Sequence, residues 1–517
     1  MADNIFTGAI SNNWPVAGNW SLGTIPTATD GHVAVFDGSS PDCDLGAGNR
    51  VCNALMMTAY TGTLAFGARS LTVSGNITLG SGMTLTGTGI LAVNDSANIT
   101  TNGYVTPFSF QFAGTNKTYT LQDDFYLLGA LSLNGTTSLT INNNGTDKTI
   151  YAGGNISAAA AGCQGTAKIK QIGTGSISTT AAIRNDLEFD ASGNTITVGT
   201  IFRYAAGTLK YTSGTIDTTT NSSTLFIGLN AVTTTVLETS AITWYNVTCT
   251  VSNTTTLNED LFCSNNFTNS GTFTLNGSGS LRMISNSGGT FTLGGSSTMQ
   301  GTSKVIFEGN DVQWIGSSGT LQSDVDIDGT LTITGVCTWR SATMTHISGT
   351  VSGTGTISVT ASATWNTSGC TFPNINITVS NQTLNSTLNV GTLTLGTGGG
   401  VNFLGSYGFN VDNLIHVTTN RQITFTTGNT YTVNQSLLLR GSAAPSSSTN
   451  SVTLTTSAPP AVAYFNVATG ATSNCMWVRA LNIDSSGGRE LYTSNGLISN
   501  SLNWVRTNPN AFLFFDN

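Results

Sequence analysis

Between residues 61 and 440, large apolar residues alternate with threonine or serine in short stretches bounded by glycine. The clearest examples read glycine, threonine, apolar, threonine, apolar, and begin at Gly271, Gly289, Gly329 and Gly391. An alternation with a period of two is the signature of a β-strand that buries one face. Glycine at the ends of such stretches supports tight turns between short strands. The pattern therefore predicts an all-β chain.

The spacing of these stretches indicates how the strands are arranged. Gly271 is followed by Gly289, and Gly329 by Gly349, each at an interval of roughly 20 residues. A loose repeat of this length, built from short strands and glycine turns, is typical of a β-solenoid. We predict an irregular parallel β-helix whose stacked coils bury leucine, isoleucine, valine and phenylalanine. The competing architecture is a string of β-sandwich domains, but this region lacks the linkers and domain-sized periods that such domains show.

The chain carries little charge for its length, which excludes several functional classes. Charged residues make up 8% of the 517 residues, against about 25% in an average protein. The scarcity of Lys, Glu, Gln and Arg argues against a helical protein, and the many β-branched and aromatic residues argue against disorder. The net charge is −8, with no basic run beyond Lys168 and Lys170, so we expect no nucleic-acid binding. No apolar stretch is long enough to span a bilayer, so we expect no membrane insertion.

Both ends of the chain differ in composition from the repetitive region. Residues 1–60 contain Trp14 and Trp20 and three of the nine prolines, which indicates an N-terminal β cap or attachment module. Residues 61–440 are the predicted solenoid. Residues 441–517 begin with a loop rich in serine, alanine and proline and end with the apolar run 512–515, which indicates a C-terminal cap or a subunit contact. Four large apolar residues in succession are costly in water, so we expect this tail to meet a sister subunit or the particle, with a tail that folds back and plugs its own solenoid as the alternative.

The two ends also carry a family resemblance. The N-terminal part contains Trp14, the run Gly18-Asn19-Trp20-Ser21, Pro26, Asp30 and the run Val35-Phe36-Asp37, and the C-terminal part contains the segment 478–488 followed by Asn503-Trp504. These segments, together with the composition of the residues between them, resemble the Thr/Gly/Asn-rich parallel β-solenoid proteins of bacteriophage particles. The resemblance implies a tail fibre, spike or capsid-decorating role, usually as a homotrimer, and it supplies no catalytic residues.

Two acidic stretches stand out in so uncharged a chain. Asp186, Glu188 and Asp190 alternate with apolar residues, and so do Asp324, Asp326 and Asp328. A period of two places each set of three carboxylates on one face of a strand. Three interpretations are open: a solvated outer face, a Ca²⁺ site built from carboxylate oxygens, or a carboxylate pair that cleaves glycosidic bonds. Apart from the Ca²⁺ of the second interpretation, we expect no cofactor.

The remaining chemically active residues favour structural roles. Exposed aromatic rings suit sugar binding, and the candidates in the middle of the chain are Trp244, Trp314, Trp339 and Trp365, with partial burial as the alternative. His346 and His416 both lie in strand-like stretches and are expected to be structural.

The cysteines also favour structural roles. None of the eight forms a Cys-x-x-Cys pair, which argues against zinc. Cys43 and Cys52 are close enough in sequence to bridge one loop, while isolated buried thiols are the expected state of the others.

These observations predict a non-enzymatic bacteriophage virion protein that serves as a fibre, spike or capsid decoration and attaches to the host surface. The expected partners are sister subunits in a homo-oligomer, a trimer by resemblance, other virion proteins and a host carbohydrate. The expected location is the virion, since residues 1–6 lack the basic and apolar regions of a secretory leader. The alternatives are a polysaccharide-depolymerising tailspike enzyme that uses paired carboxylates and an adhesin on the bacterial cell surface.

Overall fold

The computed structural model describes residues 2–135, 137–159, 162–228, 234–250, 252–340, 342–378, 380–396, 400–417, 421–441, 451–494 and 496–507. Over these residues the chain is all-β, and its parallel strands stack as a β-solenoid of about 21 turns. The helical content of this part is one short 3₁₀ segment, Ala17–Asn19. The predicted fold class is therefore confirmed. No helix among these residues is long and apolar enough to cross a membrane.

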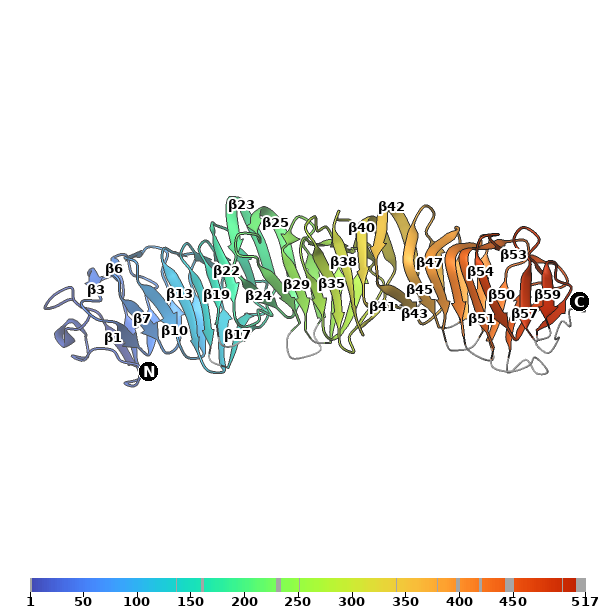
Figure 1. Ribbon diagram of the computed structural model, residues 1–517. Coiled ribbons are helices and arrows are strands. Elements are labelled where there is room, and N and C mark those ends of the chain that lie inside the picture. The colour runs from blue at the N-terminus through green and yellow to red at the C-terminus, as the bar shows by residue number, and fades with distance from the viewer. Residues whose placement is uncertain are drawn as a thin grey trace, which may run out of the picture. The chain divides into compact units, whose positions relative to one another are not determined.

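The chain divides into two compact units, Met1–Leu261 and Phe262–Asn517. Within each unit, strands from successive turns lie side by side (Figure 1). The sequence carries no marker at this division. The boundaries expected near residues 60 and 440 stay predictions.

In the first unit, each turn adds a strand to the same sheets. One sheet consists of β1 (Ala2–Ile5), β2 (His32–Val35), β5 (Ala54–Met56), β8 (Ile77–Thr78), β11 (Ala97–Thr100), β14 (Lys117–Leu121), β17 (Ser138–Asn143) and β20 (Gly162–Gln164). A second sheet includes β7 (Ser70–Val73), β10 (Ile90–Val93), β13 (Ser109–Gly114), β16 (Leu131–Gly135), β19 (Ile156–Ala158) and β22 (Gly175–Thr179). All of these neighbouring strands pair in parallel.

The interior of this unit is built from columns of apolar side chains, one from each turn. Leu71, Leu91, Phe110, Leu131 and Ile156 are consecutive partners along the second sheet. All five side chains are buried. The interval between successive members varies along the column, so turns of different length preserve the register. Each such side chain contributes about 1.5–3 kcal/mol when it is removed from water, which makes the columns the main source of stability.

An aromatic cluster closes the N-terminal end of this unit. Phe6, Trp14, Trp20, Phe36 and Tyr60 are all buried, and their neighbouring rings lie 4.8–5.8 Å apart between centroids. The indole N–H of Trp20 donates to the carbonyl oxygen of Trp14 at 2.9 Å. A solenoid end exposes core side chains unless something covers them, and these rings cover it.

The same segment also satisfies the open edge of the first strand. The Ile5 N–H donates to the hydroxyl oxygen of Ser21 at 2.8 Å, and the Ser21 N–H donates to the Ile5 carbonyl at 2.9 Å. The side chain of Asn4 accepts from the Leu22 N–H and donates to the Thr24 carbonyl. An unpaired strand edge is a template for aggregation, and the chain covers this edge with its own residues.

In the second unit, six parallel strands from successive turns belong to the larger sheet that carries the site below. They are β37 (Val305–Phe307), β40 (Val325–Thr334), β42 (Thr343–Gly353), β44 (Ala363–Asn366), β46 (Ser380–Leu384) and β48 (Val401–Gly405). Their inward column runs through Val305, Val325, Met344, Trp365 and Leu384, all of which are buried. The residues on either side of each member therefore point outward.

One spacing used to predict the repeat does not correspond to a turn. The stretch that begins at Gly271 continues into β33 (Thr272–Gly277), and the stretch that begins at Gly289 is β35 (Gly289–Gly294), which belongs to a different sheet. The partner of Phe291 one turn earlier is Phe267, not Phe273. In contrast, Gly329 and Gly349 are direct partners across one turn. The predicted interval of about 20 residues is thus one turn between Gly329 and Gly349, whereas the interval from Gly271 to Gly289 is not a turn.

The pairing of Gly329 with Gly349 leaves no room for a side chain. Gly349 has a positive φ of +86°, and a Cβ atom placed on it would lie 2.1 Å from the carbonyl oxygen of Gly329. Gly369 has a similar φ of +78°, but a Cβ atom placed on it would have no other atom within 4 Å. Alanine at position 369 would therefore bear only the backbone strain, whereas alanine at position 349 would bear a similar strain and a steric clash as well.

We expect Gly349→Ala to destabilise the protein more than Gly369→Ala. Left-handed backbone costs about 1–2 kcal/mol at either position, and the steric contact at Gly349 adds about 1–3 kcal/mol. Chemical denaturation monitored by circular dichroism measures the difference. Equal shifts of the two midpoints would contradict the close packing of successive turns at Gly349.

Candidate functional site

The first acidic stretch is held by lysines of the preceding turn. Leu187 and Phe189 of β23 (Leu187–Val198) are buried, while Glu188 and Asp190 face outward between them. Glu188 forms ion pairs with Lys168 and, at 3.4 Å, with Lys170. The ammonium group of Lys170 also lies 2.7 Å from the carboxylate of Asp190. The repulsion that motivated a search for a cation is thus offset by side chains of the protein.

This arrangement follows from the register of the strands. Tyr126, Tyr151, Lys170, Glu188 and Lys210 are consecutive partners, one from each turn. Glu188 therefore lies between two lysines of the same column. The rings of Tyr126 and Tyr151 are stacked on each other, 4.4 Å apart and 3° from parallel. Their facing surfaces are covered by this stacking, so the pair forms a structural ladder.

The electrostatic consequence appears in the pKa of Glu188. Burial raises the pKa of this carboxyl, but the hydrogen bonds from Lys168 and Thr212 and the charges of Lys168 and Lys170 outweigh burial and hold the pKa below its ordinary value. The hydrogen bond from Lys170, followed by that from Ser213, likewise lowers the pKa of Asp190. Asp186 accepts a hydrogen bond from the Thr208 N–H at 2.8 Å. All three carboxylates therefore have partners within the protein.

The second acidic stretch, at the start of β40, is also engaged. Asp326 is buried and accepts from the ammonium group of Lys304 at 2.9 Å. Asp324 accepts from the Thr343 N–H, and Asp328 accepts from the Ser348 hydroxyl, each at 2.7 Å. Among the residues that the structure describes, no three His, Cys, Asp or Glu side chains are grouped so that they could hold a metal ion. Calcium binding stays a prediction that these contacts do not support.

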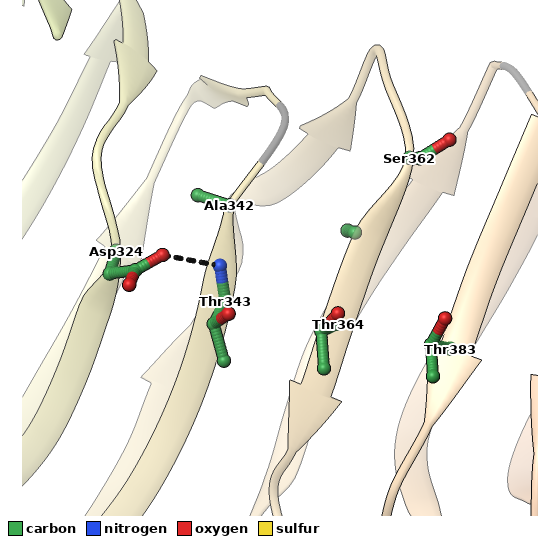
Figure 2. A pocket seen from close by; sticks show the side chains of 7 residues that line it. Asp324, Ala342, Thr343, Ser362, Thr364 and Thr383 are labelled. Carbon is green, nitrogen blue, oxygen red and sulfur yellow. Dashed lines mark hydrogen bonds between the residues drawn. The ribbon is translucent and has the colours of Figure 1, made fainter. Parts of the chain in front are cut away.

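A shallow groove lies beside Asp324 on the outer face of the second unit. Its volume is about 390 Å³, and it is lined by Asp324, Ala342, Thr343, Ser362, Ala363, Thr364 and Thr383. Figure 2 shows these residues on neighbouring strands, with the hydrogen bond from Thr343 to Asp324 at one end. We take this groove as the candidate functional site.

The hydroxyls in this groove form a regular column. Thr343 of β42 is the partner of Thr364 of β44, which is the partner of Thr383 of β46. Asp324 precedes Thr343 by one turn, so the four residues follow one another at intervals of one turn each. This regular interval was the available signal in the sequence, but it can be recognised only when the length of each turn is known.

The four tryptophans predicted to bind sugar are buried, so that prediction is wrong. Trp244, Trp314, Trp339 and Trp365 are between 0% and 1% exposed. Trp314 packs on Phe307, Trp339 lies 5.2 Å from Trp365, and Trp244 stacks on Phe202. Each ring occupies an inward position of its strand, where it contributes to the core and is not available to a ligand outside.

The histidines have structural surroundings, as expected. His416 is fully buried, and its Nδ1 lies 2.6 Å from the carbonyl oxygen of Leu395. Both ring nitrogens of His346 lie close to backbone carbonyl oxygens, at 3.0 Å from that of Ser368 and 3.2 Å from that of Gly349. Each ring is therefore engaged by the backbone.

All eight cysteines are free and buried, so Cys43 and Cys52 are not bridged. Burial raises the pKa of Cys370 to about 11 and that of Cys337 to about 12. Thiols of this kind are protonated at neutral pH and act as small apolar side chains.

No protein-family model matches the chain, and no curated protein or solved structure is similar to it at a significant level. The resemblance to phage-particle solenoids stays an expectation from the sequence.

The ion pairs of Glu188 with Lys168 and Lys170 predict that the effect of Glu188→Gln on stability depends on pH. A lowered pKa in the folded state means that Glu188 stabilises the protein fully above the pKa of the unfolded chain, about 4.3, and progressively less as the pH falls through the folded value. We expect the variant to lose about 1–3 kcal/mol at pH 7, and the gap to wild type to narrow below about pH 4. Urea denaturation at pH 7 and pH 3 measures this.

Glu259→Gln is the matched control for this prediction. Glu259 is exposed and accepts hydrogen bonds from Ser240, one from its N–H at 3.0 Å and one from its hydroxyl at 2.9 Å. We expect its replacement to change stability little at either pH. A deficit of Glu188→Gln that is the same at pH 3 and pH 7 would show that the lysines do not hold the carboxylate in its charged form.

Proposed function

We propose that this chain is a non-enzymatic structural protein of a bacteriophage particle, as a fibre, spike or capsid-decorating protein that also takes part in attachment to the host surface. The observation that carries the proposal is that each strand has an apolar inward face and a polar outward face. Apolar side chains fill most inward positions, while the outward positions carry mainly threonine, serine and asparagine. Such a chain is a self-supporting scaffold with a neutral polar surface.

The polar surface is itself tied together across the turns. Asn402 donates to Asn381 at 2.8 Å, and Gln300 donates to Thr274 at 3.3 Å, in each case between successive turns. These ladders reinforce the backbone pairing without charge, and their strength therefore depends little on salt. A protein that functions outside a cell in variable media benefits from this property.

The engaged carboxylates favour a structural role over the hydrolase alternative. A glycosidase needs one carboxyl that donates a proton and a second that acts as base or nucleophile. Glu188 is surrounded by two lysines, and Asp326 is paired with Lys304. A carboxylate that is held in its charged form by a lysine is a poor proton donor.

The assembly partners follow from the resemblance. A homotrimer, contact with other virion proteins and a host carbohydrate as receptor belong to the proposal. The apolar tail, residues 512–515, lies outside the described residues, so its role in assembly stays a prediction from the sequence.

Location is the decisive test of the proposal. We expect mass spectrometry of purified phage particles to find the chain in fixed stoichiometry with the capsid protein, and immunogold electron microscopy to place it on the particle. Cells that carry the gene but release no particles serve as the control. Detection of the chain on the surface of those cells would contradict the proposal and favour the adhesin.

The hydrolase alternative has its own test. We expect no release of reducing ends when the full chain is incubated with capsular polysaccharide or lipopolysaccharide from the host. Release that disappears in Asp324→Asn, Asp326→Asn or Glu188→Gln, but persists in Glu259→Gln, would establish the enzyme and overturn the non-enzymatic role.

A further inference from the structure

We infer that the groove beside Asp324 binds an uncharged, hydroxyl-rich glycan that lies across the strands of β42, β44 and β46. The hydroxyls of Thr343, Thr364 and Thr383 contact it, and Asp324 accepts from one of its hydroxyls. This inference deepens the proposed role in host attachment and rests on it for the source of the glycan.

The geometry of the threonine column suits a chain of repeating polar units. Neighbouring strands are about 4.8 Å apart, so the three hydroxyls from Thr343 to Thr383 extend over about 10 Å along the stacking direction. Each hydroxyl is one donor and two acceptors. A sugar chain that runs in this direction meets a hydroxyl at every turn.

These hydroxyls remain available for a ligand. No hydrogen bond joins the hydroxyl of Thr343, Thr364 or Thr383 to any residue in the described ranges, whereas some outward pairs elsewhere bond to each other, such as Asn402 with Asn381 and Gln300 with Thr274. The shallow groove of the first unit, lined by Asn76, Ser96, Ala97, Asn98, Thr118 and Thr120, offers a contrast. There, the side chains of Asn76 and Ser96 already accept from backbone N–H groups one turn later.

The floor of the groove leaves space for a sugar ring. The groove has a volume of about 390 Å³, which lies within the range of small-molecule sites. A ligand that fills it meets the hydroxyls of Thr343, Thr364 and Thr383, which line the groove on three successive turns.

The charge of the groove selects against acidic sugars. Asp324 is the one ionisable residue among those that line the groove, and one of its oxygens accepts from the Thr343 N–H at 2.7 Å. A carboxylate has further acceptor capacity, and a hydroxyl that donates to it forms a strong, charge-assisted bond. The nearby Lys304 is paired with Asp326. A glycan carboxylate or phosphate would meet a like charge and no available cation.

The absence of aromatic rings among the lining residues implies weak binding at each site. Stacking on an aromatic face is therefore not part of this recognition, and hydrogen bonds that replace bonds to water contribute little net energy. Attachment would then depend on many copies that bind one polysaccharide surface together. The test must accordingly present the protein in multivalent form.

The experiment uses the full chain, biotinylated and displayed on streptavidin, on an array of neutral and acidic oligosaccharides. We expect neutral oligosaccharides to be retained and acidic ones to give background signal. The double variant Thr364→Val/Thr383→Val should lower the signal at least fivefold, and Asp324→Asn should reduce the discrimination against acidic oligosaccharides. The matched control is Thr320→Val/Thr338→Val, which changes two partnered threonines of another sheet.

Valine has the shape and branching of threonine, so both double variants should fold, and unchanged melting midpoints verify this. Background signal for all neutral oligosaccharides, retention of acidic ones by the wild type, or equal signals from the two double variants would each overturn the inference. Incorporation into particles is measured separately. A chain present in particles without glycan binding refutes the groove alone, while threonine-dependent binding by a chain absent from particles refutes the virion role alone.

Discussion

Every feature of this molecule depends on the register of parallel strands between successive turns. Because each residue lies over its partner one turn away, a side chain that points inward is followed by inward partners along the whole column. Val305, Val325, Met344, Trp365 and Leu384 illustrate the result, since residues of very different volume share one buried column. Register also explains the tolerance of turn length, because loops take up extra residues while the paired strands keep their alignment.

The same constraint decides where charge is tolerated. In a column of partners, identical charges would lie about 4.8 Å apart and repel at every turn. The column through Lys170, Glu188 and Lys210 avoids this by alternating the sign of the charge. Most other outward columns avoid it by having no charge at all, which accounts for a composition with 8% charged residues. The low charge of the sequence is therefore a consequence of stacking, and it does not by itself identify a binding partner.

The features that follow from the period of two along a strand could be predicted from the sequence, whereas those that depend on the pairing of strands between turns could not. A period of two identifies strands and their buried faces, and it would also have placed Trp365 inward, since Ala363 and Trp365 alternate with Thr364 and Asn366. It does not reveal which strand pairs with which one turn later. The stretches that begin at Gly271 and Gly289 look alike but lie in different sheets, because each turn holds more than one strand. The lysine partners of Glu188 and the threonine column were missed for the same reason.

A solenoid of this kind gains a binding site at little cost to its fold. The inward column carries the stability, so outward residues can change independently as long as they keep strand propensity and avoid like charges. Beside Asp324, three partnered threonine hydroxyls that are not bonded to one another line a groove of about 390 Å³. The hydrogen bond from the Thr343 N–H fixes the carboxylate of Asp324 at one end of the column, so the two ends of the groove differ in charge. In the proposed glycan site, specificity arises from the spacing of the turns, which the backbone supplies, and from one charge that rejects acidic ligands.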